Sequence, residues 1–130
     1  MAYVATVTVT HRREGGRRIY KVVVAETGIT GATDEWSVAT IPVETLTLLS
    51  QSATVTPGGG SATTIDPQIQ AAASGAKVLY ANGAAAATIY NTNLNTVCNL
   101  VSRVLYGRSG ANGTADSCST TMYFAEGAAL

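Results

Sequence analysis

Apolar and polar residues alternate at the start of the chain. In residues 3–10 the odd positions are tyrosine, alanine and valine, whereas the even positions from residue 6 onward are threonine. Residues 19–26 form a second run that is rich in β-branched side chains. A period of two with such residues is typical of half-buried strands. Because Gly15 and Gly16 separate the two runs, we predict an antiparallel hairpin with a two-residue turn.

The length of this turn fixes the register of the hairpin. A shift of one residue would send paired valines to opposite faces, so the valines support the register that brings them together. The base of the hairpin then lies in the core, and its tip projects beyond it. From base to tip, the predicted pairs are Val7–Val24, Val9–Val22, His11–Tyr20, Arg13–Arg18 and Glu14–Arg17.

The rest of the chain also has the pattern of short strands separated by turns. We predict strands in residues 35–41, 43–55 and 118–127, and one at the end of 84–91, from their β-branched and apolar content. Residues 27–36, 56–61 and 107–117 are rich in Gly, Thr, Ser and Asp and are predicted loops or turns, and Pro67 predicts a break at 65–69. The alanine-rich residues 71–87 favour no single element.

Residues 97–106 fit two structures. Their apolar positions have helical spacing, but three of them are valines, the flanks are rich in turn residues and the neighbouring segments are β. We favour a strand. Several short strands with turn signals between them predict an all-β fold, an antiparallel β-sandwich or jelly-roll-like barrel with a projecting N-terminal hairpin. No repeat or linker divides the chain, so we predict one domain over residues 1–130.

The composition is low in charge. Charged residues make up 12% of the chain, against about 25% in ordinary globular proteins. This suits either a protein largely covered by neighbours or a β domain with a neutral surface, and both interpretations stay open. We predict no signal peptide, because residues 1–10 carry no Lys or Arg and no long apolar stretch, and no window approaches the ~20 apolar residues of a membrane span. We therefore expect cytoplasmic synthesis, with Cys98 and Cys118 as reduced thiols rather than a disulfide.

Residues for catalysis are scarce. His11 is the single histidine, and Ser109 lies in GRSGA, which lacks the pattern of a nucleophile elbow. Two cysteines twenty residues apart and one histidine cannot close a zinc site. Residues 57–64, PGGGSATT, lack the lysine of a phosphate-binding loop. We therefore predict a protein that is not an enzyme, with no catalytic residue, cofactor or metal site.

Positive charge is concentrated in the hairpin. Residues 11–21 hold five basic residues and one acidic residue, a net charge of +4, and the other residues hold three basic and seven acidic ones, a net charge of −4. The cluster is either a solvated tip, a docking surface for an acidic patch on a partner or sister subunit, or a contact for nucleic acid. Nucleic acid is the least favoured, because the whole domain is not basic. The candidate interface residues are Arg12, Arg13, Arg17 and Arg18.

Two longer segments resemble a known class of protein. Residues 31–69 contain an apolar strand, a glycine-rich turn and the motif TIDPQI, and residues 104–127 contain LYGRS and TTMYF. In these features the chain resembles small β-sandwich virion proteins of tailed bacteriophages, which include capsid decoration or cement proteins. The two segments together cover about half of the chain, and their motifs specify strands and turns but no functional residue.

The resemblance implies a structural protein made in the host cytoplasm and located on the capsid surface of the virion. Its partners would be the major capsid protein or another virion protein and further copies of itself, with a trimer favoured, and neither a membrane nor nucleic acid. The alternative is a carbohydrate- or surface-binding module, such as a head-fibre or tail accessory domain. That module would use the six tyrosines and Trp36 as a binding platform.

Overall fold

The structure, a computed structural model, describes residues 3–29, 35–38, 41–56, 64–70, 77–80, 84–85, 88–91, 96–100, 103–110 and 116–127. These residues form strands and connecting turns, and all strand pairs are antiparallel, which confirms the all-β prediction. No helix in the described ranges is long and apolar enough to span a membrane. The strands are β1 Val4–Glu14, β2 Arg17–Ile29, β3 Glu35–Val38, β4 Thr45–Thr56, β5 Thr64–Gln70, β6 Lys77–Tyr80, β7 Ala84–Ala85, β8 Thr88–Asn91, β9 Thr96–Asn99, β10 Leu105–Gly110 and β11 Asp116–Glu126.

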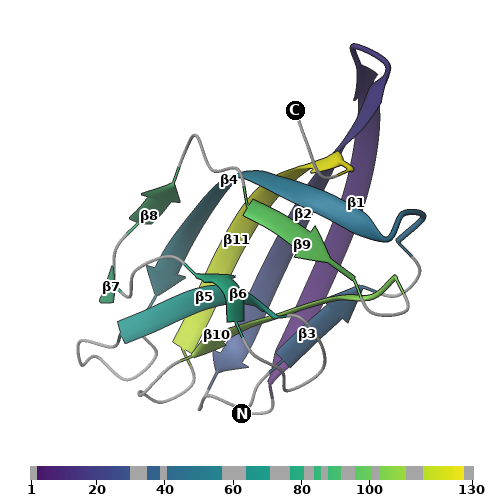
Figure 1. The fold of residues 1–130 in the computed structure, drawn as a ribbon. Helices are drawn as coiled ribbons and strands as arrows, with labels where there is room; N and C mark the ends of the chain where they lie inside the picture. Colours follow the sequence, from purple (N-terminus) through teal and green to yellow (C-terminus); the bar gives the residue numbers. More distant parts are fainter. Residues whose placement is uncertain are drawn as a thin grey trace.

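The strands form two sheets that face each other (Figure 1). The larger sheet has the order β1-β2-β11-β4-β8, and β9 pairs with the first half of β4. The smaller sheet has the order β3-β10-β5-β6, and β7 pairs with the start of β5. Met122 and Phe124 of the larger sheet share one buried cluster with Trp36 and Leu105 of the smaller sheet. The core therefore lies between the two layers of a β-sandwich.

The first hairpin has the predicted register. β1 and β2 pair without a shift from Val4 to Glu14, including Val7 with Val24 and Val9 with Val22. Gly15 and Gly16 have φ values of 59° and 80°, and positive φ at both central residues is what a type I′ turn requires. Val22 and Val24 of β2 are fully buried, which stabilises the fold by about 1.5–3 kcal/mol for each side chain. The tip extends past the other strands (Figure 1).

Other segments confirm or correct the predictions. β4, β8 and β11 match the strands predicted in 43–55, in 84–91 and in 118–127. The predicted loop at 27–36 is wrong at its start, because β2 continues to Ile29, whose side chain is fully buried. Residues 30–34 and 111–115, and the turn at 57–61, lie outside the described residues. Within the alanine-rich segment the structure describes β6 and β7.

The break predicted at Pro67 is wrong, because this residue lies inside β5. On one side Pro67 is paired with Ser109 of β10. On the other side β7 pairs with Thr64 and Ile65, and β6 begins its pairing at Gln68. A residue without an amide hydrogen is tolerated where a strand lacks a hydrogen-bonded neighbour, and Pro67 lies at such a gap among the described strands.

The loop predicted at 107–117 is wrong for its first residues, because β10 continues to Gly110. Gly107 is paired directly with Trp36, and an ideal Cβ built at residue 107 would lie 2.1 Å from the Trp36 ring. The glycine therefore serves a close packing contact rather than a turn.

The strand favoured for 97–106 is confirmed, but the segment contains two strands. β9 ends at Asn99 and β10 begins at Leu105. Between them Arg103 has a φ of 59°, a left-handed conformation that ends regular pairing. Its carbonyl accepts a hydrogen bond from the Ile41 amide at 2.8 Å.

Candidate functional site

The four candidate arginines do not form one patch. Side chains alternate between the two faces of a strand, and the register pairs Arg13 with Arg18 on the face that carries the valines. Arg12 and Arg17 lie on the opposite, outer face of the larger sheet. The hairpin therefore presents two arginines on each face.

Arg17 and Arg18 bind the end of β11 in the same chain. The Arg17 Nη2 donates to the carbonyl oxygen of Glu126 at 2.7 Å. The Arg18 amide donates to Glu126 Oε1 at 3.0 Å, and the Arg18 Nε lies 3.8 Å from Glu126 Oε2. Arg18 and Glu126 are 32% and 24% exposed, so the pair is partly shielded from water. These contacts join the hairpin to the end of its neighbour β11, and we call them the clasp.

Replacing Glu126 with alanine is expected to loosen the hairpin tip and to lower the free energy of unfolding by about 1–2 kcal/mol. The reason is that a hydrogen bond to a charged group contributes about 1.5–3 kcal/mol when buried, and partial exposure reduces this value. Amide hydrogen exchange should become faster at Arg18, while Val22 and Val24 in the base stay protected.

Glu44→Ala is the matched control. Glu44 also faces an arginine, at 4.0 Å from Arg103, but its side chain is 76% exposed, so its loss should change stability by less than about 0.5 kcal/mol. Equal effects of the two substitutions would contradict the clasp.

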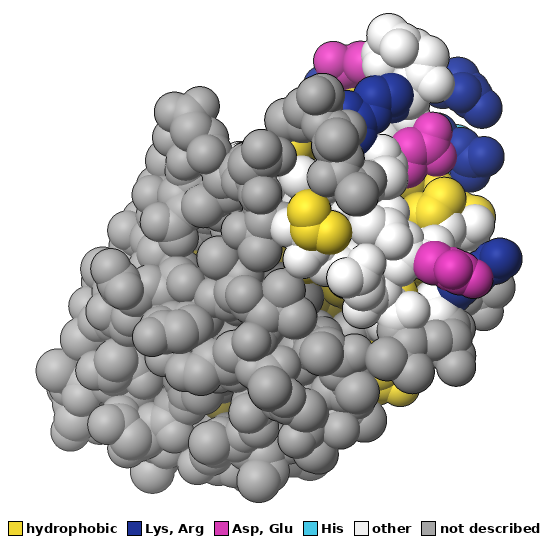
Figure 2. Space-filling view, in the orientation of Figure 1, with side chains coloured by type: hydrophobic (Ala, Val, Ile, Leu, Met, Phe, Trp, Pro, Cys, Tyr) yellow, Lys and Arg dark blue, Asp and Glu magenta, His cyan; other side chains and the backbone are white. Residues whose placement is uncertain are grey.

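Arg12 and Arg13 lie on the surface of the tip. Arg12 is paired with Glu14 of its own strand at 2.5 Å, and the two side chains are 70% and 52% exposed. Arg13 is exposed and makes no ion pair with a described acidic side chain. Figure 2 shows basic and acidic side chains together at the hairpin end of the molecule, and a further basic and acidic pair lower on the same side. A surface ion pair of this kind contributes little to stability, so these charges are available to another molecule.

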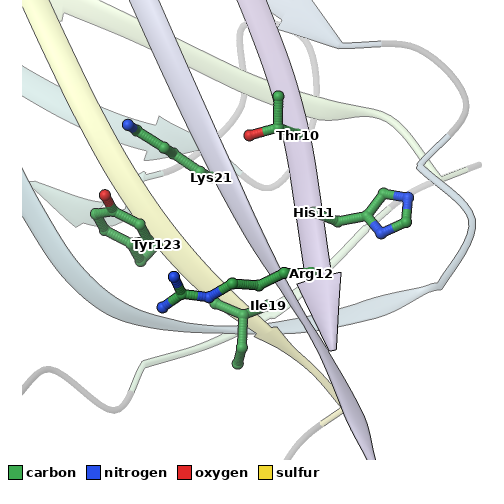
Figure 3. Close-up of a pocket in the computed structure, with 6 residues that line it drawn as sticks. All are labelled: Thr10, His11, Arg12, Ile19, Lys21 and Tyr123. Atoms are coloured by element: carbon green, nitrogen blue, oxygen red, sulfur yellow. The ribbon is translucent and has the colours of Figure 1, made fainter. Parts of the chain in front are cut away.

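A cavity of about 310 Å³ lies on the outer face beside the tip. Figure 3 shows the Arg12 side chain extending past Ile19 toward the Tyr123 ring, with Lys21 and Thr10 further along the strands and His11 directed away from them. The Lys21 ammonium lies 6.0 Å from the centre of the Tyr123 ring, at the limit of a cation–π contact. The described lining residues include two cations, a phenol and a hydroxyl, and none of them is acidic, so the cavity can receive a carboxylate. We call this the tip cavity.

The sequence alone did not reveal two residues of this region. Tyr123 and Glu126 lie in β11, and they reach the tip because β11 pairs with β2 over most of its length. Each is an ordinary strand residue in the local pattern, so no signal short of the pairing of distant strands could have identified it.

Two of the aromatic residues expected in the platform of a sugar-binding module are buried, and the side chains of Tyr80 and Tyr90 lie outside the described residues. Trp36 is buried in the core, and so is Tyr20, whose ring lies 5.7 Å from that of His11. The Tyr3 hydroxyl is directed to the buried Glu26 carboxylate and donates to its Oε2 at 2.6 Å. Tyr123 in the tip cavity is the tyrosine that lines a described opening.

The cysteines are buried thiols that form no disulfide, as predicted. Burial raises the pKa of the Cys98 thiol to about 11, and the Cys118 Sγ lies 3.5 Å from the Thr120 hydroxyl oxygen. A thiol that stays protonated at neutral pH is a poor nucleophile. Among the described residues, no three His, Cys, Asp or Glu side chains are placed to hold a metal ion.

The outer face of the larger sheet is neutral away from the tip. On β1, β2, β4 and β11 its exposed positions away from the tip are Val4 and hydroxyl-bearing or small residues, namely Thr6, Thr8, Thr10, Ala25, Thr27, Thr54, Thr56 and Ser119. The low charge of the composition is therefore visible on one face, and the cations of the hairpin lie at one end of it. The arrangement fits adhesion to an acidic surface.

Comparisons of the chain with protein families, with curated proteins and with solved structures found no match in any of the three.

Proposed function

We propose that the chain is a non-enzymatic structural protein of a bacteriophage virion, a decoration or cement protein on the capsid surface. The observation that carries the proposal is the projecting hairpin, whose base packs in the core while Arg12 and Arg13 remain exposed at its tip. The resemblance of residues 31–69 and 104–127 to such virion proteins supports the same class. The partner is the major capsid protein or another virion protein, and further copies of the chain.

The proposed mechanism is adhesion by a prearranged tip. The clasp holds the tip in place before binding, so less conformational entropy is lost when the partner binds. Acidic side chains of the capsid would face the exposed arginines, and one of them would enter the tip cavity. On a repeating lattice, several weak contacts of this kind add up to tight attachment.

Replacing Arg12 and Arg13 together with serine is expected to weaken capture by capsids about tenfold and to leave the fold intact. Each exposed ion pair contributes up to about 1 kcal/mol, and about 1.4 kcal/mol corresponds to a factor of ten. The measurement is co-sedimentation with capsids of the virus that encodes the chain, assembled without it. Arg17 and Arg18 are left in place, because their substitution would also break the clasp.

The matched comparison uses single substitutions. Arg13→Ser and Arg103→Ser remove the same charge from exposed positions, one on the hairpin tip and one at the turn before β10. Only the first should reduce capture. Equal loss in both would mean that overall charge and not the tip governs binding, and full capture by the double variant would remove the tip from the mechanism.

The tip cavity also favours a second candidate, a carbohydrate- or surface-binding module. Tyr123 and Ile19 offer apolar contact, and Lys21 and Thr10 offer polar contact, a mixture that suits a sugar. A glycan array distinguishes the two functions. Binding to glycans by a protein that no capsid captures would replace the first proposal with the second.

A further inference from the structure

Strand β1 forms an open edge of the larger sheet. β2 pairs with one side of it over all 11 residues, and no described strand pairs with the other side. The other described outermost strands are short: β3, β6, β8 and β9 have four residues each, and β7 has two. Among the described strands, β1 is therefore the one long row of main-chain donors and acceptors without a partner strand.

This edge lacks the usual protection against pairing. Natural edge strands carry charged residues, proline or bulges that discourage the addition of another strand. Residues 4–10 contain no charge, proline or glycine, and the pairing of β1 with β2 has no register shift. Such an edge is expected to be covered in the working protein.

The side chains of β1 are incompletely covered as well. Val22 and Val24 of β2 are fully buried, whereas their partners Val9 and Val7 are only half-buried. Ala5 on the same face is also half-buried. A strand added beside β1 would cover these three side chains and would also form hydrogen bonds with the unpaired main-chain donors and acceptors of β1.

We propose that β1 pairs with β1 of a second copy of the chain, antiparallel and across a two-fold axis, so that the two larger sheets become continuous. Charge decides the direction. A parallel pair would set residues 11–13 of the two copies side by side, and like charges there are destabilising. In the antiparallel pair each basic segment lies beyond the uncharged segment of its partner.

The pattern of β1 suits pairing with itself. Valine and alanine occupy one face at alternate positions and threonine the other, so a register that places odd residues opposite odd residues aligns the half-buried side chains of both copies. A two-fold contact uses the same surface on both subunits and closes with two copies. The inference goes beyond attachment to a capsid, because it concerns the free protein, and it replaces the trimer implied by the resemblance with a dimer.

The test measures the mass of the free protein by light scattering after size exclusion. The expected mass is twice the chain mass of 13.3 kDa. Thr6→Lys with Thr8→Lys places like charges on both sides of the axis and is expected to yield monomer at the same concentration. Thr54→Lys with Thr56→Lys adds the same charge at exposed positions of the same face, on the inner strand β4, and should leave the dimer intact.

Cross-linking provides a measurement that does not depend on a destabilised variant. Single variants Thr6→Cys, Thr8→Cys and Thr10→Cys, and their pairwise mixtures, are oxidised and examined for disulfide-linked dimers. Residues opposite each other in antiparallel strands have Cα atoms about 4.5–5.5 Å apart, within the range of a disulfide. The pair nearest the axis should link first, whereas Thr54→Cys should not link. The native cysteines are buried and add little background.

A native mass of one or three chains would overturn the proposal, and so would a lysine variant that is folded and still dimeric. If the lysine variant does not fold, the cross-linking pattern decides. Linkage at Thr54→Cys as fast as at the β1 positions would contradict pairing at this edge. None of these outcomes depends on capsid binding, so the dimer and the proposed function can fail separately.

Discussion

Replacing Gly107 with alanine is expected to lower the free energy of unfolding by about 3 kcal/mol, at the upper end of the effect of overpacking a core. A Cβ at this position would lie 2.1, 2.4 and 2.8 Å from three atoms of the Trp36 ring. Both residues are buried, so the ring has no solvent-filled space into which it can move. The midpoint of thermal unfolding should fall by roughly 10 °C in a domain of this size.

A double-mutant cycle tests the cause of this loss. Trp36→Leu replaces the indole ring with a smaller aliphatic side chain and by itself leaves a cavity, which destabilises the core. In the double variant the new methyl group occupies part of that cavity, so the two losses should fall short of additivity by more than about 1 kcal/mol. If the two losses of stability are additive, the methyl group introduced by Gly107→Ala does not clash with the Trp36 ring. A Gly107→Ala variant as stable as the native protein would contradict the close packing of Gly107 against Trp36.

Gly107 also shows where sequence reasoning stops. In the local pattern GRSG, glycine and serine predict a turn. Only the partner strand β3 explains why a glycine is needed at residue 107. Trp36 lies far away along the chain and reaches Gly107 through the pairing of β3 with β10. The same holds for Pro67, which predicts a break until the gap between β6 and β7 is known.

The first hairpin was predictable because all its information is local. Two adjacent strands, a two-residue glycine turn and four valines leave one register that buries the apolar face. The alternation also divides the arginines between the two faces, as the structure has them. The contacts of Arg17 and Arg18 with Glu126 were not predictable in this way, because Glu126 lies in the last strand, far from the hairpin in the sequence.

The proposed dimer and the proposed attachment fit together. Antiparallel pairing of β1 would direct the two hairpin tips to opposite ends of a continuous sheet, since each tip lies at the end of its own β1. Two tips on one rigid body could contact two neighbouring capsid subunits. Attachment through both would exceed the affinity of either, provided that the spacing matches the lattice.

Raising the pH from 9 to 11 is expected to lower the stability of the native chain more than that of Cys98→Ala, by about 2 kcal/mol. Burial raises the pKa of the Cys98 thiol from 9.0 to about 11. Between these values the unfolded chain releases the thiol proton while the folded chain keeps it, so ionisation stabilises the unfolded state. Two pH units at about 1.36 kcal/mol each set the upper limit of the loss, and half-ionisation of the thiol at each end of this pH range reduces it to about 2 kcal/mol.

The comparison between variants isolates this one thiol. Tyrosines and lysines also titrate above pH 9, but they are the same in both chains and cancel in the difference. The packing lost in Cys98→Ala does not change with pH. It therefore lowers the free energy of unfolding by the same amount at every pH and leaves the slope of stability against pH unchanged. Urea unfolding at each pH gives the two curves. Parallel curves from pH 9 to 11 would show that the Cys98 thiol is not buried in the folded protein, and that the contact between β9 and β4 which covers it is open to water.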